Sequence, residues 1–139
     1  MPKYSFGTTS TARLETCSFP IQQIMREALA YGIMDFAISE GVRSDWKQHE
    51  YFLAGKSRLD AGDPRAMHNR VPSDAVDAVP YINGKYSYIK AHCCVLAGII
   101  QAAAKKIGYT VRWGGDWDMD GEPITDQEFQ DLVHFERRE

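Results

Sequence analysis

Basic residues, long apolar runs and cysteines are all scarce in this 139-residue chain. Its 16 Lys and Arg residues fall short of its 19 Asp and Glu residues, so the net charge of -3 offers no basic surface for nucleic acid or anionic lipid. No apolar run approaches the roughly 20 residues that a membrane-spanning helix needs. Cys93 and Cys94 are adjacent in an odd set of three, so no disulfide framework is expected. We therefore expect no nucleic-acid partner and no membrane insertion.

The first residues, Met-Pro-Lys-Tyr-Ser-Phe-Gly, also lack the apolar core of a secretory signal. Synthesis and folding in a cytoplasm are therefore expected. An apolar content of 44% is ordinary for a globular protein, and 139 residues can build one core without disulfide or metal cross-links. The sequence predicts a single domain over residues 1–139, which we expect to be a monomer.

Hydrophobic periodicity divides the chain into helices and strands. Apolar residues at helical spacing, with Ser44 as one cap, predict helices at 20–30, 44–53 and 87–107. Alternating runs predict strands at 34–39, 74–79, 109–113 and 132–136. Thr125 and Glu128 have the form of a capping box, which predicts a short helical turn before the last strand. The segment 56–73 is rich in Gly, Pro, Asp and Arg and is predicted to be a long loop, which favours a functional role.

Two short segments carry the residues that suggest a metal. His68 ends the long loop, and Asp77 follows inside an apolar run that alternates like a strand. A buried aspartate loses hydration and needs a strong partner such as a cation or a metal ion. The last predicted strand adds His134. Two histidines and one carboxylate leave the fourth position on zinc open, which is typical of a catalytic site.

Each of these residues also has an ordinary structural explanation. His68 could be a surface loop histidine, Asp77 could pair with a core arginine, and His134 could be a satisfied histidine in a sheet. The other two histidines are weaker metal ligands. His92 lies beside two cysteines on a predicted helix, where consecutive side chains diverge. His49 lacks the second histidine of the His-Glu-x-x-His helix motif.

Four pieces in order resemble the VanY-type zinc D-Ala-D-Ala peptidases, and within them the bacteriophage L-alanyl-D-glutamate endopeptidases that act as endolysins. The pieces are Gly-Val-Arg-Ser at 41–44, the run 68–81, Arg-Trp-Gly-Gly-Asp-Trp at 112–117, and 131–136. The resemblance implies an α+β fold of the D-Ala-D-Ala peptidase or hedgehog-like kind, with a small antiparallel sheet that carries the zinc site and is flanked by helices. It also implies hydrolysis of the peptidoglycan stem peptide after the inner membrane is breached.

The resemblance also implies a role for each site residue. It makes His68, Asp77 and His134 the ligands of one Zn²⁺ ion and Asp131 the general base. It places Arg43 near the scissile carbonyl, where a guanidinium would stabilise an oxyanion or hold a substrate carboxylate. A bend-stabilising role for Asp131 and a structural salt bridge for Arg43 are the alternatives.

Two features depart from the family pattern. Eight residues, 69–76, separate His68 from Asp77, more than the family has, so Asp74 is an alternative third ligand. The match over 75–81 favours Asp77. The base is Asp131 where the carboxypeptidase branches carry Glu, which resembles the phage endopeptidases. The alternative functions are a D-Ala-D-Ala carboxypeptidase on the same site and a non-catalytic zinc-stabilised binding module.

A separate acidic run, Asp-Trp-Asp-Met-Asp-Gly at 116–121, has the first half of a calcium loop. Asp116, Asp118 and Asp120 place carboxylates at alternate positions, and Gly121 suits the sharp turn. Gln127 stands where a bidentate Glu would close the loop. Two hypotheses stay open: a solvated acidic turn, and a Ca²⁺ site that orders the segment leading into the last strand.

Overall fold

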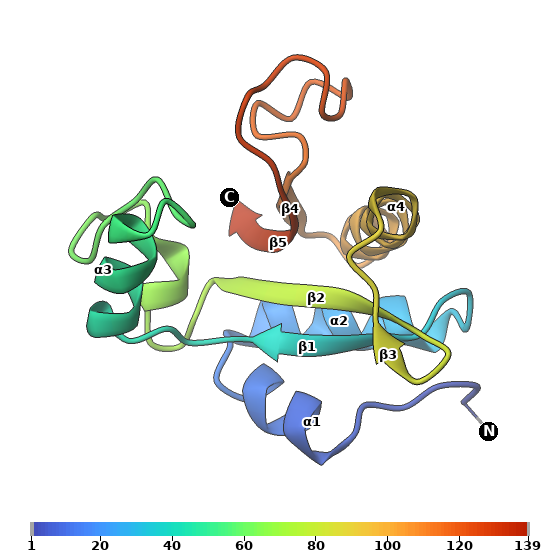
Figure 1. Ribbon diagram of the computed structural model, residues 1–139. Coiled ribbons are helices and arrows are strands. Elements are labelled where there is room, and N and C mark those ends of the chain that lie inside the picture. Colours follow the sequence, from blue (N-terminus) through green and yellow to red (C-terminus); the bar gives the residue numbers. More distant parts are fainter. Residues whose placement is uncertain (1, 139) are drawn as a thin grey trace.

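The computed structural model describes residues 2–138, which form a five-stranded antiparallel sheet with helices packed around it (Figure 1). The strand order is β1-β2-β5-β4, and β3 pairs with β2 as a short hairpin. The strands are β1 (Phe36–Glu40), β2 (Ala75–Ile82), β3 (Lys85–Tyr86), β4 (Thr110–Gly114) and β5 (Asp131–Arg138). The α+β prediction with a small antiparallel sheet is confirmed.

Four α-helices and one short 3-10 turn accompany the sheet in the described residues 2–138. They are α1 (Thr8–Leu14), α2 (Phe19–Ala30), α3 (Asp45–Leu53), η1 (Met67–Asn69) and α4 (Lys90–Lys106). Helices α2 and α4 pack against each other, α4 also covers β2, β4 and β5, and α1 packs on β1 (Figure 1). The core between these layers is continuous and includes Leu14, Ile24, Ile38, Leu96, Ile100 and Phe135, all at most 1% exposed. No helix within residues 2–138 is both long enough and apolar enough to cross a membrane.

The helices follow from the apolar spacing in the sequence. Helix α2 has Pro20 in its first turn and buries Ile21, Ile24, Met25, Ala28 and Leu29 along one face. Helix α3 begins after Ser44, whose side chain accepts a hydrogen bond from the backbone N–H of Lys47 at 3.1 Å. Helix α4 ends before Gly108, where φ is +90°, a left-handed conformation that glycine adopts without strain.

Several predicted boundaries are wrong. Helix α4 begins at Lys90 rather than at residue 87, because Ile89 has an extended backbone and is 60% exposed. No helical turn follows Thr125, because the side chains of Gln127 and Gln130 bond to backbone groups of the loop and hold it in an irregular path. Helix α1 was not predicted, since its short run Thr-Thr-Ser-Thr-Ala-Arg-Leu lacks an apolar stripe.

Two long loops connect the elements around the sheet, one between α3 and β2 and one between β4 and β5. The predicted loop 56–73 contains the 3-10 turn η1, which carries His68. The loop between β4 and β5 rises above the sheet in Figure 1, and α3 with its following loop stands at the side. A tight turn at Asn83 and Gly84, with φ of +51° and +76°, joins β2 to β3. Strand β2 thereby runs on to Ile82, three residues beyond the predicted end.

Candidate metal centre

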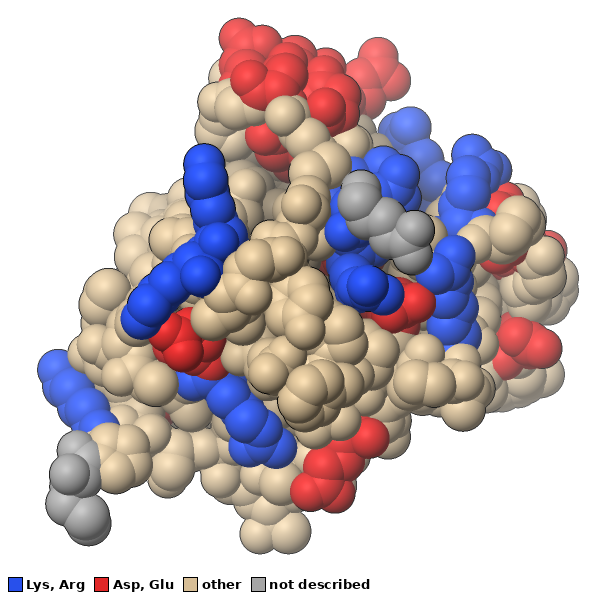
Figure 2. All heavy atoms as spheres, turned by 180° about the vertical axis from the view of Figure 1, so that it is seen from behind, with Lys and Arg blue, Asp and Glu red and all other residues tan. Residues whose placement is uncertain are grey.

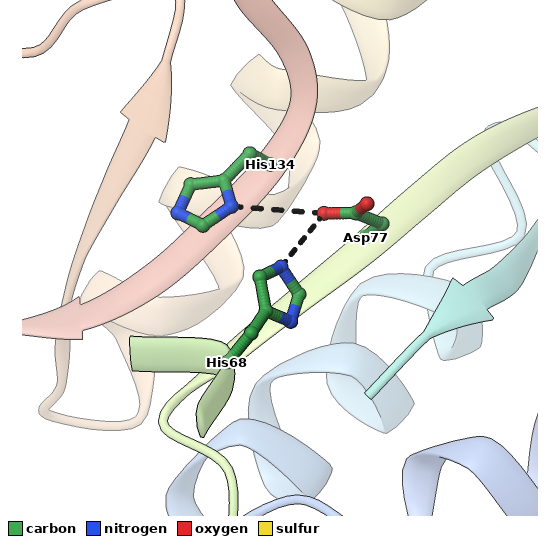
Figure 3. A group of neighbouring side chains, drawn as sticks. All are labelled: His68, Asp77 and His134. Atoms are coloured by element: carbon green, nitrogen blue, oxygen red, sulfur yellow. Dashed lines mark hydrogen bonds and ion pairs between the residues drawn. The ribbon is translucent and has the colours of Figure 1, made fainter. Parts of the chain in front are cut away.

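Three side chains from separate segments meet at one point (Figure 3). Asp77 and His134 are directly opposed residues on the paired strands β2 and β5, and His68 reaches them from η1. Asp77 Oδ1 lies 3.1 Å from His68 Nε2 and 3.6 Å from His134 Nδ1. One ligand atom from each residue lies within 4.8 Å of the other two, so the group could hold a metal ion.

The ring of His68 is oriented by the chain after β1. Its Nδ1–H donates to the carbonyl oxygen of Gly41 at 2.7 Å, which leaves Nε2 free to face Asp77. In return the backbone N–H of Arg43 donates to the carbonyl of His68 at 2.7 Å. Gly41 is required here, because a Cβ at that position would overlap the carbonyl oxygen of Arg13.

The ring of His134 is oriented by a buried carboxylate. Its Nε2–H donates to Glu136 Oε1 at 2.9 Å, so Nδ1 faces Asp77. Glu136 is 3% exposed, and its other oxygen accepts from Arg112 at 2.9 Å and Arg138 at 3.2 Å. Glu136 was not predicted as a site residue, although strand alternation places it on the same face as His134.

Charges within this group stabilise one another. Burial alone would raise the pKa of Asp77, but the two neighbouring histidines hold it well below its usual range. Burial lowers the pKa of His134, yet hydrogen bonds to Asp77 and Glu136 outweigh it and raise the pKa to about 9. Without a metal, the carboxylates of Asp77 and Glu136 therefore favour a positive charge on His134.

Asp74 lies outside this group. Its Oδ2 accepts a hydrogen bond from Arg70 at 3.0 Å. Asp74 precedes β2, whereas Asp77 is inside the strand and opposite His134. Of the two aspartates considered, the geometry therefore brings only Asp77 to the histidines.

Asp131 is the first residue of β5 and lines the same cavity as the three candidate ligands. Burial and the negative charge of Asp77 raise its pKa, against the lowering effects of the histidines and Arg43. Its backbone is fitted closely to β4, because a Cβ on the opposed Gly114 would overlap the carbonyl oxygen of Asp131. The position suits a carboxylate that exchanges protons with a substrate in the cavity.

Arg43 is 9% exposed and is held on several sides. Its Nε and Nη2 donate to the two oxygens of Glu40 at 2.7 and 3.2 Å, and Nη1 donates to Gln48 at 2.9 Å. Nη2 also lies 3.9 Å from Asp77 Oδ2, the oxygen that does not face the histidines. Glu40 is the register partner of Asp77 on β1, so these charges form a row across the sheet. Neither Glu40 nor Gln48 was predicted as a site residue.

The remaining histidines stay away from this centre. His49 Nδ1 lies 2.7 Å from Asp60 Oδ1, and His92 Nδ1 lies 2.6 Å from the hydroxyl of Ser87. Neither residue lines the cavity that holds the candidate ligands.

The cavity has a volume of about 530 Å³ and one aromatic wall. The Trp117 ring lies 5.5 Å from the ring of His134 and stacks on Phe129 at 6.2 Å with an interplanar angle of 19°. Trp117 Nε1 donates to the carbonyl of Phe129 at 2.9 Å, which joins the two sides of the loop between β4 and β5. The wall can exclude water from one side of a bound peptide.

The acidic loop forms a second carboxylate group, visible as a red crest at the top of the molecule in Figure 2. Asp116, Asp118 and Asp120 come together there as the alternate spacing suggested. Asp116 is 8% exposed, and its Oδ1 has no hydrogen-bond partner among residues 2–138. Gln127 lies outside the group: its Oε1 accepts from the backbone N–H of Trp117 at 2.9 Å.

Comparison with known proteins gives consistent results. The model of the phage L-alanyl-D-glutamate peptidase family matches residues 2–137. The L-alanyl-D-glutamate peptidase of Escherichia phage T5 is 32% identical over 121 residues, which are 86% of this chain and 85% of that protein. The crystal structure of the Serratia marcescens L-Ala D-Glu endopeptidase ChiX matches with a TM-score of 0.75 and 28% identity, covering 96% of this chain and 90% of that chain.

Proposed function

This chain belongs to the phage L-alanyl-D-glutamate peptidase family, and we propose that it hydrolyses the L-alanyl-D-glutamate bond of peptidoglycan stem peptides as a zinc-dependent endolysin. The observation that carries the proposal is the group of His68, Asp77 and His134 at the base of a cavity that Asp131 also lines. Membership of the family supports this bond, and the donor set supports zinc.

Zinc fits the residues present. Two imidazole nitrogens and one carboxylate oxygen are zinc donors, and three protein ligands leave room for a fourth. The outer N–H of His68 donates to a backbone carbonyl, and that of His134 donates to the carboxylate of Glu136. Such outer contacts are typical of histidines that bind a metal through the other ring nitrogen.

The residues around the ligands suit peptide hydrolysis. Zinc, when bound, supplies a water that is nucleophilic near neutral pH and polarises the scissile carbonyl. Asp131 accepts the proton that the attacking water loses and transfers it to the amine of the departing D-glutamate. Arg43 holds Asp77 through the carboxylate oxygen that faces away from the histidines, as a positioning residue.

Mass spectrometry of purified peptidoglycan after digestion tests the function. We expect new carboxyl-terminal L-alanine and new amino-terminal D-glutamate, and release of both to be at least about 100-fold slower with the variant Asp131→Asn. Release of single D-alanine residues would assign the site to a D-Ala-D-Ala carboxypeptidase instead. If the stem peptides stay intact while the protein binds the wall, the protein is a non-catalytic zinc-stabilised binding module.

We also propose that the acidic loop binds Ca²⁺ through Asp116, Asp118 and Asp120. The buried, unpaired Oδ1 of Asp116 supports a cation there, since a buried carboxylate oxygen without a partner is unfavourable. The loop leads directly into β5, so calcium would order the segment that begins with Asp131. The alternative is a solvated acidic turn.

Calorimetric titration of the zinc-loaded protein with calcium tests this second site. Wild-type protein should take up one Ca²⁺, and Asp118→Ala should not. Absence of heat at millimolar calcium, or equal binding by the variant, would remove the proposal.

We propose finally that residues 1–139 act as one monomeric domain, made in the host cytoplasm and active on the wall after the membrane is breached. The continuous core from α1 to β5 supports one domain. Light scattering of the purified protein should give the mass of a single 15.7 kDa chain. A dimer would contradict the monomer.

A further inference from the structure

Two cationic side chains of the cavity have neither a role in the proposed chemistry nor a carboxylate partner within residues 2–138. Lys56 and Arg58 both line it, from the loop after α3, and both are exposed. Arg43 and Arg112 line it too, but each is paired with a buried glutamate. Over residues 2–138, neither Lys56 nor Arg58 has a carboxylate within ion-pair distance. Among the described residues, these two positive charges line the cavity without a carboxylate partner.

Arg58 is held in position by an aromatic face. Its guanidinium carbon lies 4.9 Å from the ring centroid of Phe129, which in turn stacks on Trp117 beside His134. A guanidinium that stacks on an aromatic ring keeps the N–H groups along its edge available as donors. Because the guanidinium is planar and held in position, two of its N–H groups can donate to the two oxygens of a carboxylate.

The scissile bond defines where a substrate offers a carboxylate. The carboxyl group of L-alanine is consumed in the bond, whereas D-glutamate contributes its amine and retains two carboxyl groups. One of these continues the stem peptide, and the other is either a free carboxylate or a carboxamide. The glutamate side therefore presents a negative charge close to the bond that is cleaved, and the residue after glutamate can present another.

We propose that Arg58, with Lys56 beside it, binds a free carboxylate on the glutamate side of the scissile bond and so selects stem peptides whose D-glutamate is not amidated. The proposal rests on the proposed function and adds a specificity-determining residue to it. Capping the carboxylate as an amide removes its charge, leaving Arg58 with a much weaker acceptor. The wall of Phe129 and Trp117 sets the direction from which the carboxylate approaches.

The test uses zinc-loaded protein and two synthetic stem peptides that differ only in having D-glutamate free or amidated, with the carboxyl group of the third residue capped in both. Wild-type kcat/KM should be about 10- to 100-fold higher for the free acid, the scale of one charge-assisted hydrogen bond. Arg58→Gln should lose this preference by slowing only the free acid, and Arg58→Lys should restore part of it.

Arg65→Gln is the matched control. Arg65 lines the same cavity, but its guanidinium is bound to Asp63 at 2.8 and 3.1 Å, so the substrate preference should persist. Equal cleavage of both peptides by wild type, or equal slowing of both by Arg58→Gln, overturns the proposal and leaves the proposed function standing. Cleavage of neither peptide by wild type overturns both.

A second peptide pair identifies which carboxylate is bound. It keeps D-glutamate amidated and varies the third residue between free acid and amide. A preference for the free acid that Arg58→Gln removes only in this pair would assign Arg58 to the third residue's carboxylate and overturn the selection at glutamate.

Discussion

At the residue scale, the proposed proton transfer and the proposed metal binding belong to different side chains: Asp131 for the first and the three candidate ligands for the second. Asp131 lines the cavity but is not one of the three side chains whose ligand atoms converge. Replacing it with asparagine keeps its size and removes its basicity. We expect Asp131→Asn to retain stoichiometric zinc and its fold, and to lower kcat by a factor on the order of 10²–10⁴.

Metal analysis, circular dichroism and steady-state kinetics on one preparation measure the three properties together. Asp74→Asn is a matched control, because Asp74 pairs with Arg70 outside the site. Turnover of Asp131→Asn near the wild-type value would remove Asp131 as the base. Loss of zinc from Asp74→Asn, with zinc retained by Asp77→Asn, would reverse the ligand assignment.

Arg43 illustrates how a single buried charge depends on its partner. The Arg43 and Glu40 side chains are 9% and 10% exposed and bond through two N–H groups. Arg43→Gln leaves the charge of Glu40 buried, and among the described residues 2–138 the remaining cation within ion-pair distance is Lys47, at 3.4 Å. We expect the free energy of unfolding to fall by about 3–5 kcal/mol, the usual cost of breaking a buried pair from one side.

Urea unfolding of the zinc-loaded protein measures this loss. The double variant Glu40→Gln, Arg43→Gln removes both charges and should recover a large part of the stability. If Arg43→Gln is as stable as wild type, the pair of Arg43 and Glu40 does not stabilise the fold, which would leave substrate binding as the role of Arg43.

The pairing of β4 with β5 sets the position of the proposed base at the scale of the element. Gly114 opposes Asp131, and a Cβ at Gly114 would overlap the backbone carbonyl of Asp131. Gly114→Ala must therefore displace the start of β5. We expect a loss of about 1–3 kcal/mol in the free energy of unfolding, together with lower kcat because Asp131 moves.

Gly98→Ala is the matched control for that substitution. Gly98 is exposed within α4, and a Cβ there would meet no atom within 4 Å. Alanine should stabilise the helix by about 0.5–1 kcal/mol and leave kcat unchanged. Chemical denaturation and kinetics on both variants check the pair, and full activity in Gly114→Ala would contradict the close fit of β4 on β5.

The proposed metal site joins three segments of the whole molecule, since its residues come from η1, β2 and β5. A ligand that binds only the folded chain stabilises it by an amount that grows with free ligand, about 4 kcal/mol at a thousandfold excess over Kd. Chelation should therefore lower the unfolding midpoint and abolish hydrolysis, and added zinc should restore both. Asp77→Asn should not respond to zinc; a normal response would place the metal elsewhere.

The effect of zinc on stability should also depend on pH. In the zinc-free protein the pKa of His134 is raised to about 9 from the ordinary 6.5, against the lowering effect of burial, by Asp77 and Glu136. A raised folded-state pKa gives stability that is complete below about pH 6.5 and is lost as the pH rises through about 9. Zinc needs the deprotonated ring and binds more tightly over that same range. The difference in unfolding midpoint between zinc-loaded and zinc-free protein should widen from about pH 6 to about pH 9. A constant or narrowing difference would contradict the role of His134.

The sequence by itself determined the elements whose signal is local. The spacing of Ile21, Ile24 and Met25 places one face of α2 in the core. Ser44 marks the start of α3, and Gly108 marks the end of α4. Local apolar periodicity and local backbone preferences control these features, so a short window of sequence contains the information. The ordered pieces around His68 and His134 likewise identified the family before any fold was known.

Only the tertiary structure decided which side chains meet. The choice between Asp77 and Asp74 depends on the register of β2 against β5, which begins about fifty residues further along the chain. The contacts of Arg43 with Glu40 and of His134 with Glu136 depend on burial that no local pattern encodes. The segment at Thr125 resembled a helix start, yet side-chain hydrogen bonds to the surrounding loop outweighed that weak preference. Long-range pairing places the site because its free energy comes from contacts between segments, which only the folded chain brings together.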